Sequence, residues 1–151
     1  MQKLRHEDVT IIVDTREQRP FNVSPMREER MKLDSGDYSI KGLEKLVSVE
    51  RKELNDLVGC FATGRERFKA ELEKLRLIPK RLVVVEGTWG QLAEGDFTSR
   101  VHPNSAMGSV ASWSGFFEIG FFFAGSRKRA QGFTVNYLWH VARKHYEGEM
   151  K

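Results

Sequence analysis

The amino-acid sequence predicts an α/β fold in which a mixed central β-sheet is flanked by helices. Short β-branched runs separated by glycine turns occupy the first 52 residues, as expected for a meander of strands. Beyond them, amphipathic segments with helical spacing alternate with further apolar runs, which is typical of an α/β sandwich. No repeat, low-complexity tract or linker divides the chain, so we expect one domain over residues 1–151.

The N-terminal region is expected to hold a buried strand followed by a loop. Residues 9–13 form a short β-branched run that ends at Asp14, which fits a buried strand. Residues 18–30 contain two prolines and clustered charges. This composition favours a loop, with one helical turn at residues 25–30.

A hairpin and two helices are expected next. Glycines punctuate two short β-prone runs, as a hairpin requires. Apolar residues then recur at helical spacing in two segments, and Pro79 stops the second. These elements are predicted, in order, as strands at 37–40 and 46–52 and helices at 54–61 and 64–78.

The rest of the chain alternates between strands and helices. Residues 82–85, Leu-Val-Val-Val, are the best candidate for a buried strand. The later elements are predicted as a helical turn at 89–93, a helix at 103–117, a short buried strand at 119–124 and a final helix capped by Ser126. The final helix carries an apolar stripe of Ala130, Phe133, Tyr137 and Val141.

The composition excludes several classes of protein. Cys60 is the only cysteine, so no disulfide framework forms within the chain. No stretch approaches the roughly 20 apolar residues that span a bilayer, and no P-loop is present, so neither a membrane nor a nucleotide cofactor is expected. The net charge of +4 is small; basic clusters at 127–129 and 143–144 fit either phosphate contacts or a solvated helix face.

Acidic residues and one lysine gather at the ends of predicted strands. Because side chains alternate across a strand, Glu50 and Lys52 project to one side and Arg51 to the other. If Asp37 begins the neighbouring strand, its carboxylate can approach Glu50, and Asp14 follows another strand. Carboxylates so close repel one another unless a cation holds them, and oxygen ligands suit Mg²⁺ or Mn²⁺. The pattern therefore predicts metal-dependent hydrolysis of a phosphodiester, with Lys52 orienting water or stabilising charge.

These motifs resemble those of a known family. Gly36-Asp37, Glu50-Arg51-Lys52 and Asp56 are similar to the GDx…ERKxxxD signature of the XPF/Hef-type structure-specific endonucleases, the ERCC nuclease domain of the PD-(D/E)XK restriction-endonuclease-like superfamily. Upstream, Asp14-Thr15-Arg16-Glu17 looks like the DxRE of the family's first core strand, and Gly64-Arg65 like its step into a long helix. The motifs cover roughly residues 9–90.

The resemblance implies a restriction-endonuclease-like core and a role for each matched residue. Asp37, Glu50 and the backbone carbonyl of Arg51 would bind the metal ion, and Lys52 would be the catalytic lysine. Asp14 and Asp56 would complete the acidic catalytic site, with Asp14 as a further candidate metal ligand.

The resemblance also implies contacts with DNA. Arg16 and Arg65 would hold the DNA backbone or order the acidic groups. The family often places a glutamine on the helix after Gly64-Arg65; this chain has no glutamine there, and Lys69 is the residue expected to serve the same face.

The expected function is that of a Mg²⁺- or Mn²⁺-dependent DNA endonuclease acting at flap, fork or other branched DNA in repair or recombination. The family's cleavage leaves a 5′-phosphate and a 3′-hydroxyl. No helix-hairpin-helix DNA-binding domain is expected within 151 residues. One alternative is a nuclease-like module that binds DNA or a partner without cutting, and another is a restriction-type nuclease that cuts plain duplex. We expect an intracellular protein, in the cytoplasm or nucleoid of a bacterium, an archaeon or a phage-infected cell.

A homodimer is a further expectation. Five of the ten phenylalanines lie between residues 116 and 123, which fits either a buried strand or excess apolar surface at an interface. Domains of the XPF type dimerise through their C-terminal region, so the resemblance favours the interface.

Overall fold

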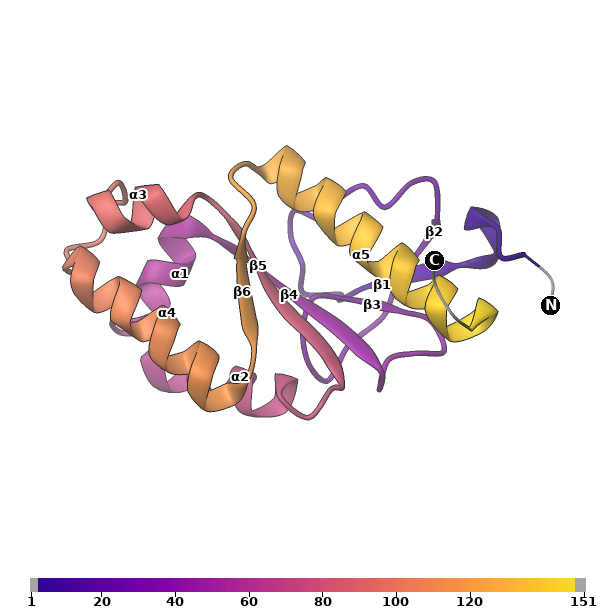
Figure 1. Ribbon diagram of the computed structural model, residues 1–151, viewed down its shortest axis with the longest axis horizontal. Helices are drawn as coiled ribbons and strands as arrows, with labels where there is room; N and C mark the ends of the chain where they lie inside the picture. Colours follow the sequence, from indigo (N-terminus) through magenta and orange to yellow (C-terminus); the bar gives the residue numbers. More distant parts are fainter. Residues whose placement is uncertain (1–2, 149–151) are drawn as a thin grey trace.

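The computed structural model describes residues 3–148 and contains one mixed six-stranded sheet with helices on both faces (Figure 1). The strands lie in the order β2-β1-β3-β4-β5-β6. Their bounds are Thr10–Val13 for β1, Arg27–Arg30 for β2, Tyr38–Ile40 for β3, Val47–Glu53 for β4, Lys80–Glu86 for β5 and Gly120–Phe123 for β6. The helices are η1 (His6–Asp8), α1 (Leu54–Cys60), α2 (Arg65–Leu75), α3 (Trp89–Glu94), α4 (Pro103–Phe117) and α5 (Arg127–Glu147).

The strand directions divide the sheet into two parts. Strand β3 runs antiparallel to both of its neighbours, β1 and β4, whereas β2 runs parallel to β1 at one edge. Strands β4, β5 and β6 are all parallel, so each of the two connections between them needs a crossover that contains helices. The crossovers place α1 and α2 between β4 and β5, and α3 and α4 between β5 and β6.

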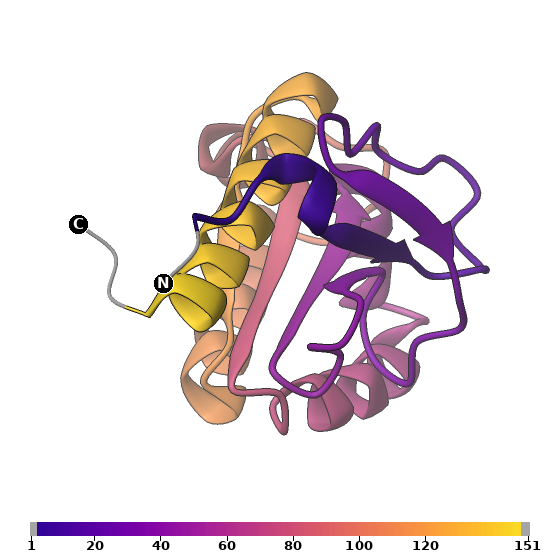
Figure 2. The same cartoon turned by 90° about the vertical axis from the view of Figure 1, so that its right-hand side faces the viewer.

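Helix α5 packs on one face of the sheet, and α1, α2, α3 and α4 cover the other face (Figures 1 and 2). The side chains of β5 show the division, because Val84 belongs to the core under α5 while Val83 and Val85 belong to the core under the other helices. Each core excludes water from one face, so the sheet is rigid where β3 and β4 meet. No helix in residues 3–148 is long and apolar enough to cross a membrane.

Most predicted elements are confirmed to within one or two residues at the start of each strand and helix. The long helix predicted at 103–117 is α4, and Ser126 caps α5 by accepting a hydrogen bond from the Arg129 N–H over 3.1 Å. The predicted hairpin is the antiparallel pair β3–β4. Helix α2 ends at Leu75, four residues before Pro79, so the proline marks the start of β5 and not the end of the helix.

The helical turn predicted at residues 25–30 is wrong, because residues 27–30 form the edge strand β2. The N–H groups of Arg27 and Met31 donate to the carbonyls of Val9 and Val13, which joins β2 to β1. Its side chains, Arg-Glu-Glu-Arg, are exposed or half-exposed, so no apolar alternation marks the strand in the sequence. Charged residues of this kind are typical of sheet edges, where they hinder pairing with other chains.

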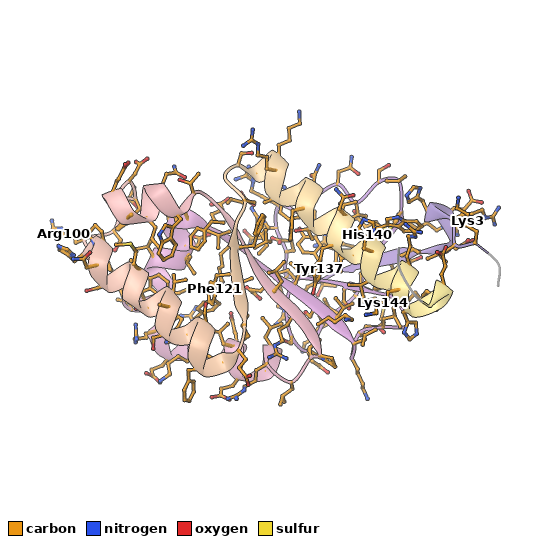
Figure 3. All side chains as sticks on the ribbon, in the orientation of Figure 1. Lys3, Arg100, Phe121, Tyr137, His140 and Lys144 are labelled. Atoms are coloured by element: carbon orange, nitrogen blue, oxygen red, sulfur yellow. The ribbon has the colours of Figure 1, made fainter. Side chains whose placement is uncertain are left out.

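Strand β6 was predicted to be buried, and it is instead the second edge of the sheet. Phe121 and Phe123 are half-buried, and Phe122 is 40% exposed. Figure 3 shows Phe121 on β6 and Tyr137 on α5; the two side chains pack against opposite cores. The predicted apolar stripe of α5 is likewise only partly buried. Phe133 is half-buried and stacks on Phe122, with ring centroids 4.0 Å apart.

Candidate active site

A hollow of about 410 Å³ lies beside the junction of β3 and β4 and is bordered by α2. Five of the residues singled out in the sequence line it: Asp14, Arg16, Asp37, Glu50 and Lys52. They come from the end of β1, the residue before β3 and the middle of β4. A larger hollow of about 580 Å³ lies elsewhere, at the carboxyl ends of β4 and β5, and is lined by other residues, among them Glu53, Glu86 and Arg127.

The backbone turn at Gly36 brings Asp37 against β4. Gly36 has a φ of +78°, a conformation that favours glycine, and a Cβ there would lie 2.0 Å from Ser48 Oγ. The Asp37 N–H donates to the Val49 carbonyl over 2.8 Å, and Tyr38 pairs with Val49 in the ladder. Asp37 and Glu50 are therefore the next opposed pair, so the antiparallel register places the two acids side by side.

Glu50 is buried and Asp37 is partly buried, and both carboxyl groups resist ionisation. Burial raises the pKa of Asp37 to about 6, although a hydrogen bond donated by the Arg51 N–H to Asp37 Oδ2 over 2.8 Å opposes the shift. Burial and then the charge of Asp37 raise the pKa of Glu50 well above its ordinary value. Two such acids cannot both be charged without a compensating cation.

Lys52 supplies one positive charge to this pair. Its Nζ lies 3.3 Å from Glu50 Oε2 and 4.0 Å from Glu71 Oε2, and 4.9 Å from the centre of the Phe68 ring. Burial by itself lowers the pKa of Lys52, but the charges of Glu50 and then of other acidic groups outweigh it and raise the pKa. Lys52 is therefore a permanent cation at the floor of the hollow.

Asp14 is held rigidly at the edge of the same hollow. The Asp14 carboxylate accepts hydrogen bonds from Arg16 Nε, Nη2 and N–H and from the Leu33 N–H, over distances of 2.8 to 3.1 Å. Burial alone would raise the pKa of Asp14, but these hydrogen bonds outweigh it and lower the pKa. The visible role of Asp14 is to fix Arg16, whose side chain is 63% exposed.

Asp37 and Glu50 are the residues best placed to hold a metal ion. They offer only hard oxygen atoms, and a divalent cation would relieve their mutual repulsion, so the donor set fits Mg²⁺ or Mn²⁺. Among residues 3–148, no three His, Cys, Asp or Glu side chains are grouped closely enough to bind one ion together. The structure thus brings Asp37 and Glu50 together but does not add Asp14 to them as a third side-chain ligand; a ligand role for Asp14 or for the Arg51 carbonyl stays a prediction.

Two other predicted residues, Asp56 and Arg65, lie outside this hollow. Asp56 is in the first turn of α1 and lines a neighbouring hollow of about 430 Å³, which shares Lys52 and Glu71 with the first. Arg65 points to α4, where Nη1 donates to Ser109 Oγ over 3.2 Å and the guanidinium lies 4.8 Å from the Trp113 ring centre. Arg65 therefore stabilises the packing of α2 on α4, and its DNA contact stays a prediction.

Lys69 was expected to face the site from the helix, and the structure turns a different face of α2 toward it. The described α2 residues that line the hollow are Arg67, Ala70, Glu71 and Lys74. Positions 67, 71 and 74 are neighbours on one side of a helix, and Lys69 is not on that side. Sequence reasoning missed these three charged residues, although their spacing along one flank of the apolar stripe of Phe68, Leu72 and Leu75 was visible in the chain.

The Arg51 side chain lies on the other face of the sheet and forms a buried charged cluster. It is 8% exposed and pairs with Glu17 over 3.1 Å, with Glu53 over 3.3 Å and closely with Glu86. Arg127 Nη1 also approaches Glu86, at 3.5 Å. Glu17, the last residue of the Asp14-Thr15-Arg16-Glu17 motif, therefore serves this cluster and not the hollow.

Comparison with known proteins identifies the family to which the chain belongs. The ERCC4 domain matches residues 2–137 of the chain. XPF from Aeropyrum pernix has the same fold, with a TM-score of 0.69 and 18% sequence identity over 91% of this chain and 67% of that one. A structure described as XPF from Aeropyrum pernix in complex with DNA gives a TM-score of 0.67 and 18% identity, over 90% of this chain and 66% of that one.

This chain therefore spans about two thirds of the length of those two proteins. No curated protein matches the sequence. The structural likeness at 18% identity establishes the fold, and the domain match extends over most of the residues that build the sheet and the hollow. The chain belongs to the ERCC4 domain family and has the XPF-like nuclease fold.

Proposed function

We propose that this domain is a DNA endonuclease that depends on a divalent metal ion. The observation that carries the proposal is the meeting of Asp37, Glu50 and Lys52 in one hollow. The carboxyl groups of Asp37, partly buried, and Glu50, buried, are opposite each other, and the ammonium of Lys52 lies 3.3 Å from Glu50. A protein that only binds DNA gains nothing from carboxylates that face a phosphate backbone. Membership of the ERCC4 domain family supports the same assignment.

Each residue has a distinct chemical role in this proposal. Asp37 and Glu50 would hold Mg²⁺ or Mn²⁺, which when bound polarises a phosphoryl oxygen and lowers the pKa of a bound water. Lys52 acts as a fixed positive charge beside the oxygens on which negative charge develops. Its raised pKa makes Lys52 a poor proton acceptor, which favours this role over that of a general base.

The cations around the hollow are proposed to hold the DNA backbone. Arg16 at one rim and Arg67 and Lys74 on α2 surround the acidic pair. Such contacts position a duplex without reading its sequence, which suits an enzyme that recognises the shape of its substrate. The structure described as XPF from Aeropyrum pernix in complex with DNA supports DNA as the partner. Preference for flap, fork or other branched DNA in repair or recombination, with intracellular DNA as the target, follows from the family resemblance.

The proposal is tested by cleavage of flap, fork, duplex and single-stranded DNA in Mg²⁺, Mn²⁺ or chelator. We expect the wild type to cut branched DNA only with metal, and Asp37→Asn and Lys52→Met to reduce cleavage at least about a thousandfold. Glu73→Gln, on α2 and paired with Arg76, is a matched control that keeps full activity. Binding of forked DNA with cleavage no greater than that of both site variants would show a non-catalytic binding module. Cleavage of plain duplex at fixed positions would show a restriction-type nuclease.

We further propose that two copies associate through the edge strand β6. Among residues 3–148 the strand pairs only with β5, which leaves its outer backbone groups open, and Phe122 on β6 is 40% exposed. Phe116 at the end of α4 is 65% exposed. Sedimentation velocity should show a dimer at micromolar concentration that Phe122→Glu converts to a monomer, and a wild-type mass that stays monomeric at every concentration would contradict the proposal.

A further inference from the structure

Lys52 is held from two different elements of the fold. Its Nζ lies 3.3 Å from Glu50 Oε2, on its own strand β4, and 4.0 Å from Glu71 Oε2, on helix α2. Among residues 3–148, these two carboxylates are the ion-pair partners of Lys52. The Phe68 ring, 4.9 Å from Nζ, closes a third side and favours a cation at this position.

The two partners differ in exposure and in what else they do. The Glu50 side chain is 11% exposed, whereas that of Glu71 is 48% exposed. Solvent weakens the attraction between Glu71 and Lys52, so the ammonium lies closer to Glu50 when no other cation is present. Glu50 is also the proposed metal ligand, so the metal ion and the ammonium compete for one carboxylate.

We propose that Glu71 is a positioning residue that keeps the Lys52 ammonium in place when Glu50 binds the metal ion. The inference rests on the proposed function and adds a residue that no motif contains. Glu71 stands at the boundary between the two hollows, which share Lys52, Arg67 and Glu71. Glu71 contacts Lys52 without joining Asp37 and Glu50, because no three His, Cys, Asp or Glu side chains among residues 3–148 are grouped closely enough to bind one ion.

The expected consequence is a coupling between Glu71 and metal affinity that runs through Lys52. Without the Glu71 carboxylate, Glu50 is the one remaining ion-pair partner of the Lys52 ammonium among the described residues. The metal ion must then displace the ammonium from Glu50. Partners that orient a metal ligand indirectly usually change metal affinity by about 10- to 100-fold when removed. If Lys52 is absent, nothing competes for Glu50, so loss of Glu71 should then have little effect.

The test is a double-mutant cycle on Mn²⁺ binding, measured by isothermal titration calorimetry without DNA. Glu71→Gln should weaken Mn²⁺ binding about tenfold in the wild-type background and leave it unchanged in the Lys52→Ala background. Glu73→Gln removes the same charge from the same helix at a residue paired with Arg76, and it should bind Mn²⁺ like the wild type. Glu71→Asp keeps the charge but withdraws it from Lys52, so it should also weaken binding. Circular dichroism confirms that each variant is folded.

Three outcomes would overturn the inference. If Glu71→Gln weakens Mn²⁺ binding equally in both backgrounds, Glu71 acts only by attracting the ion electrostatically and not through Lys52. Wild-type affinity in Glu71→Gln or in Glu71→Asp would mean that the contact with Lys52 has no role. A wild type that binds no Mn²⁺ at all would contradict the metal dependence in the proposed function together with the inference, whereas an additive cycle in a protein that binds Mn²⁺ contradicts the inference alone.

Discussion

The backbone N–H of Arg51 donates a hydrogen bond to Asp37 Oδ2 over 2.8 Å, while the Arg51 side chain is buried on the opposite face of the sheet. One residue thus connects the candidate catalytic acid to the charged cluster that contains Glu17 and Glu86. The same alternation along β4 turns Glu50 and Lys52 toward the hollow. The position of the acidic pair therefore depends on the ion pairs that Arg51 makes on the face of the sheet opposite the hollow.

Removal of the Arg51 side chain should destabilise the fold. Arg51→Met would leave Glu17 buried without its cation and Glu86 with Arg127 as its remaining partner, and breaking a buried pair in this way costs about 3 to 5 kcal/mol. Urea denaturation followed by circular dichroism measures the loss. Arg5→Met, which removes an exposed arginine paired with Glu7, is the control and should leave the midpoint unchanged. Equal midpoints for the two variants would show that the cluster does not anchor β4.

The buried acid pair should make the metal-free protein less stable as the pH rises. Burial raises the pKa of Asp37 to about 6, above its ordinary value of about 4. The folded state therefore holds this proton more tightly than the unfolded state, so the stabilisation is complete below about pH 4 and is lost as the pH rises through about 6.

Thermal denaturation in chelator, at a series of pH values, measures this effect. Asp37→Asn removes the titrating group. The melting temperature of the variant relative to that of the wild type should therefore rise across this pH range and stay constant above it. Excess Mn²⁺ near neutral pH should raise the melting temperature of the wild type and not that of Asp37→Asn, because ligand binding stabilises the folded state. A difference between the two proteins that is constant with pH would contradict the prediction.

Gly36 should tolerate no side chain, whereas Gly59 should. At Gly36 the backbone has a φ of +78°, and a Cβ would lie 2.0 Å from Ser48 Oγ and 3.2 Å from the Val49 carbonyl. Gly36→Ala should therefore cost about 2 kcal/mol and displace Asp37, with loss of cleavage. Gly59 lies in α1 with nothing within 4 Å of a Cβ, so Gly59→Ala should gain about 0.5 kcal/mol. Urea denaturation of both variants decides, and similar effects at the two glycines would refute this assignment.

Arg16 and Arg65 should differ in their effect on DNA binding. The Arg16 side chain is 63% exposed at the rim of the hollow, whereas the Arg65 guanidinium lies over Trp113. Loss of one phosphate contact reduces the dependence of log K on log salt by about one unit, so Arg16→Ala should show this change. Arg65→Ala should keep the wild-type salt slope but unfold at lower urea. Fluorescence anisotropy with a forked DNA at several salt concentrations provides the measurement, and the reverse result would restore Arg65 as a DNA-binding residue.

Local patterns in the sequence predicted most of the fold and the centre of the candidate site. The alternation of β4 placed Glu50 and Lys52 on one face and Arg51 on the other, because the side-chain period of a strand does not depend on its neighbours. The proline in the first turn of α4 and the serine cap of α5 likewise mark the start of their own helices. The two strands predicted at 37–40 and 46–52 do pair antiparallel, and Tyr38 opposite Val49 in their register brings Asp37 to Glu50.

Features that depend on which elements are neighbours were not predictable in the same way. Strand β2 shows no apolar pattern and exists because its backbone pairs with β1, and β6 is half-exposed because no strand covers its outer side among the described residues.

The sequence by itself thus determined most of the secondary structure and identified the acidic pair and Lys52 as candidate site residues. The tertiary structure alone decided that Glu71 contacts Lys52 and that Arg65 contacts Ser109 on α4. It also decided that Arg51 pairs with Glu86 on the face of the sheet opposite the hollow. The physical reason is that periodicity fixes the side of an element on which a residue lies, whereas burial, charge pairing and pKa depend on what packs against that side.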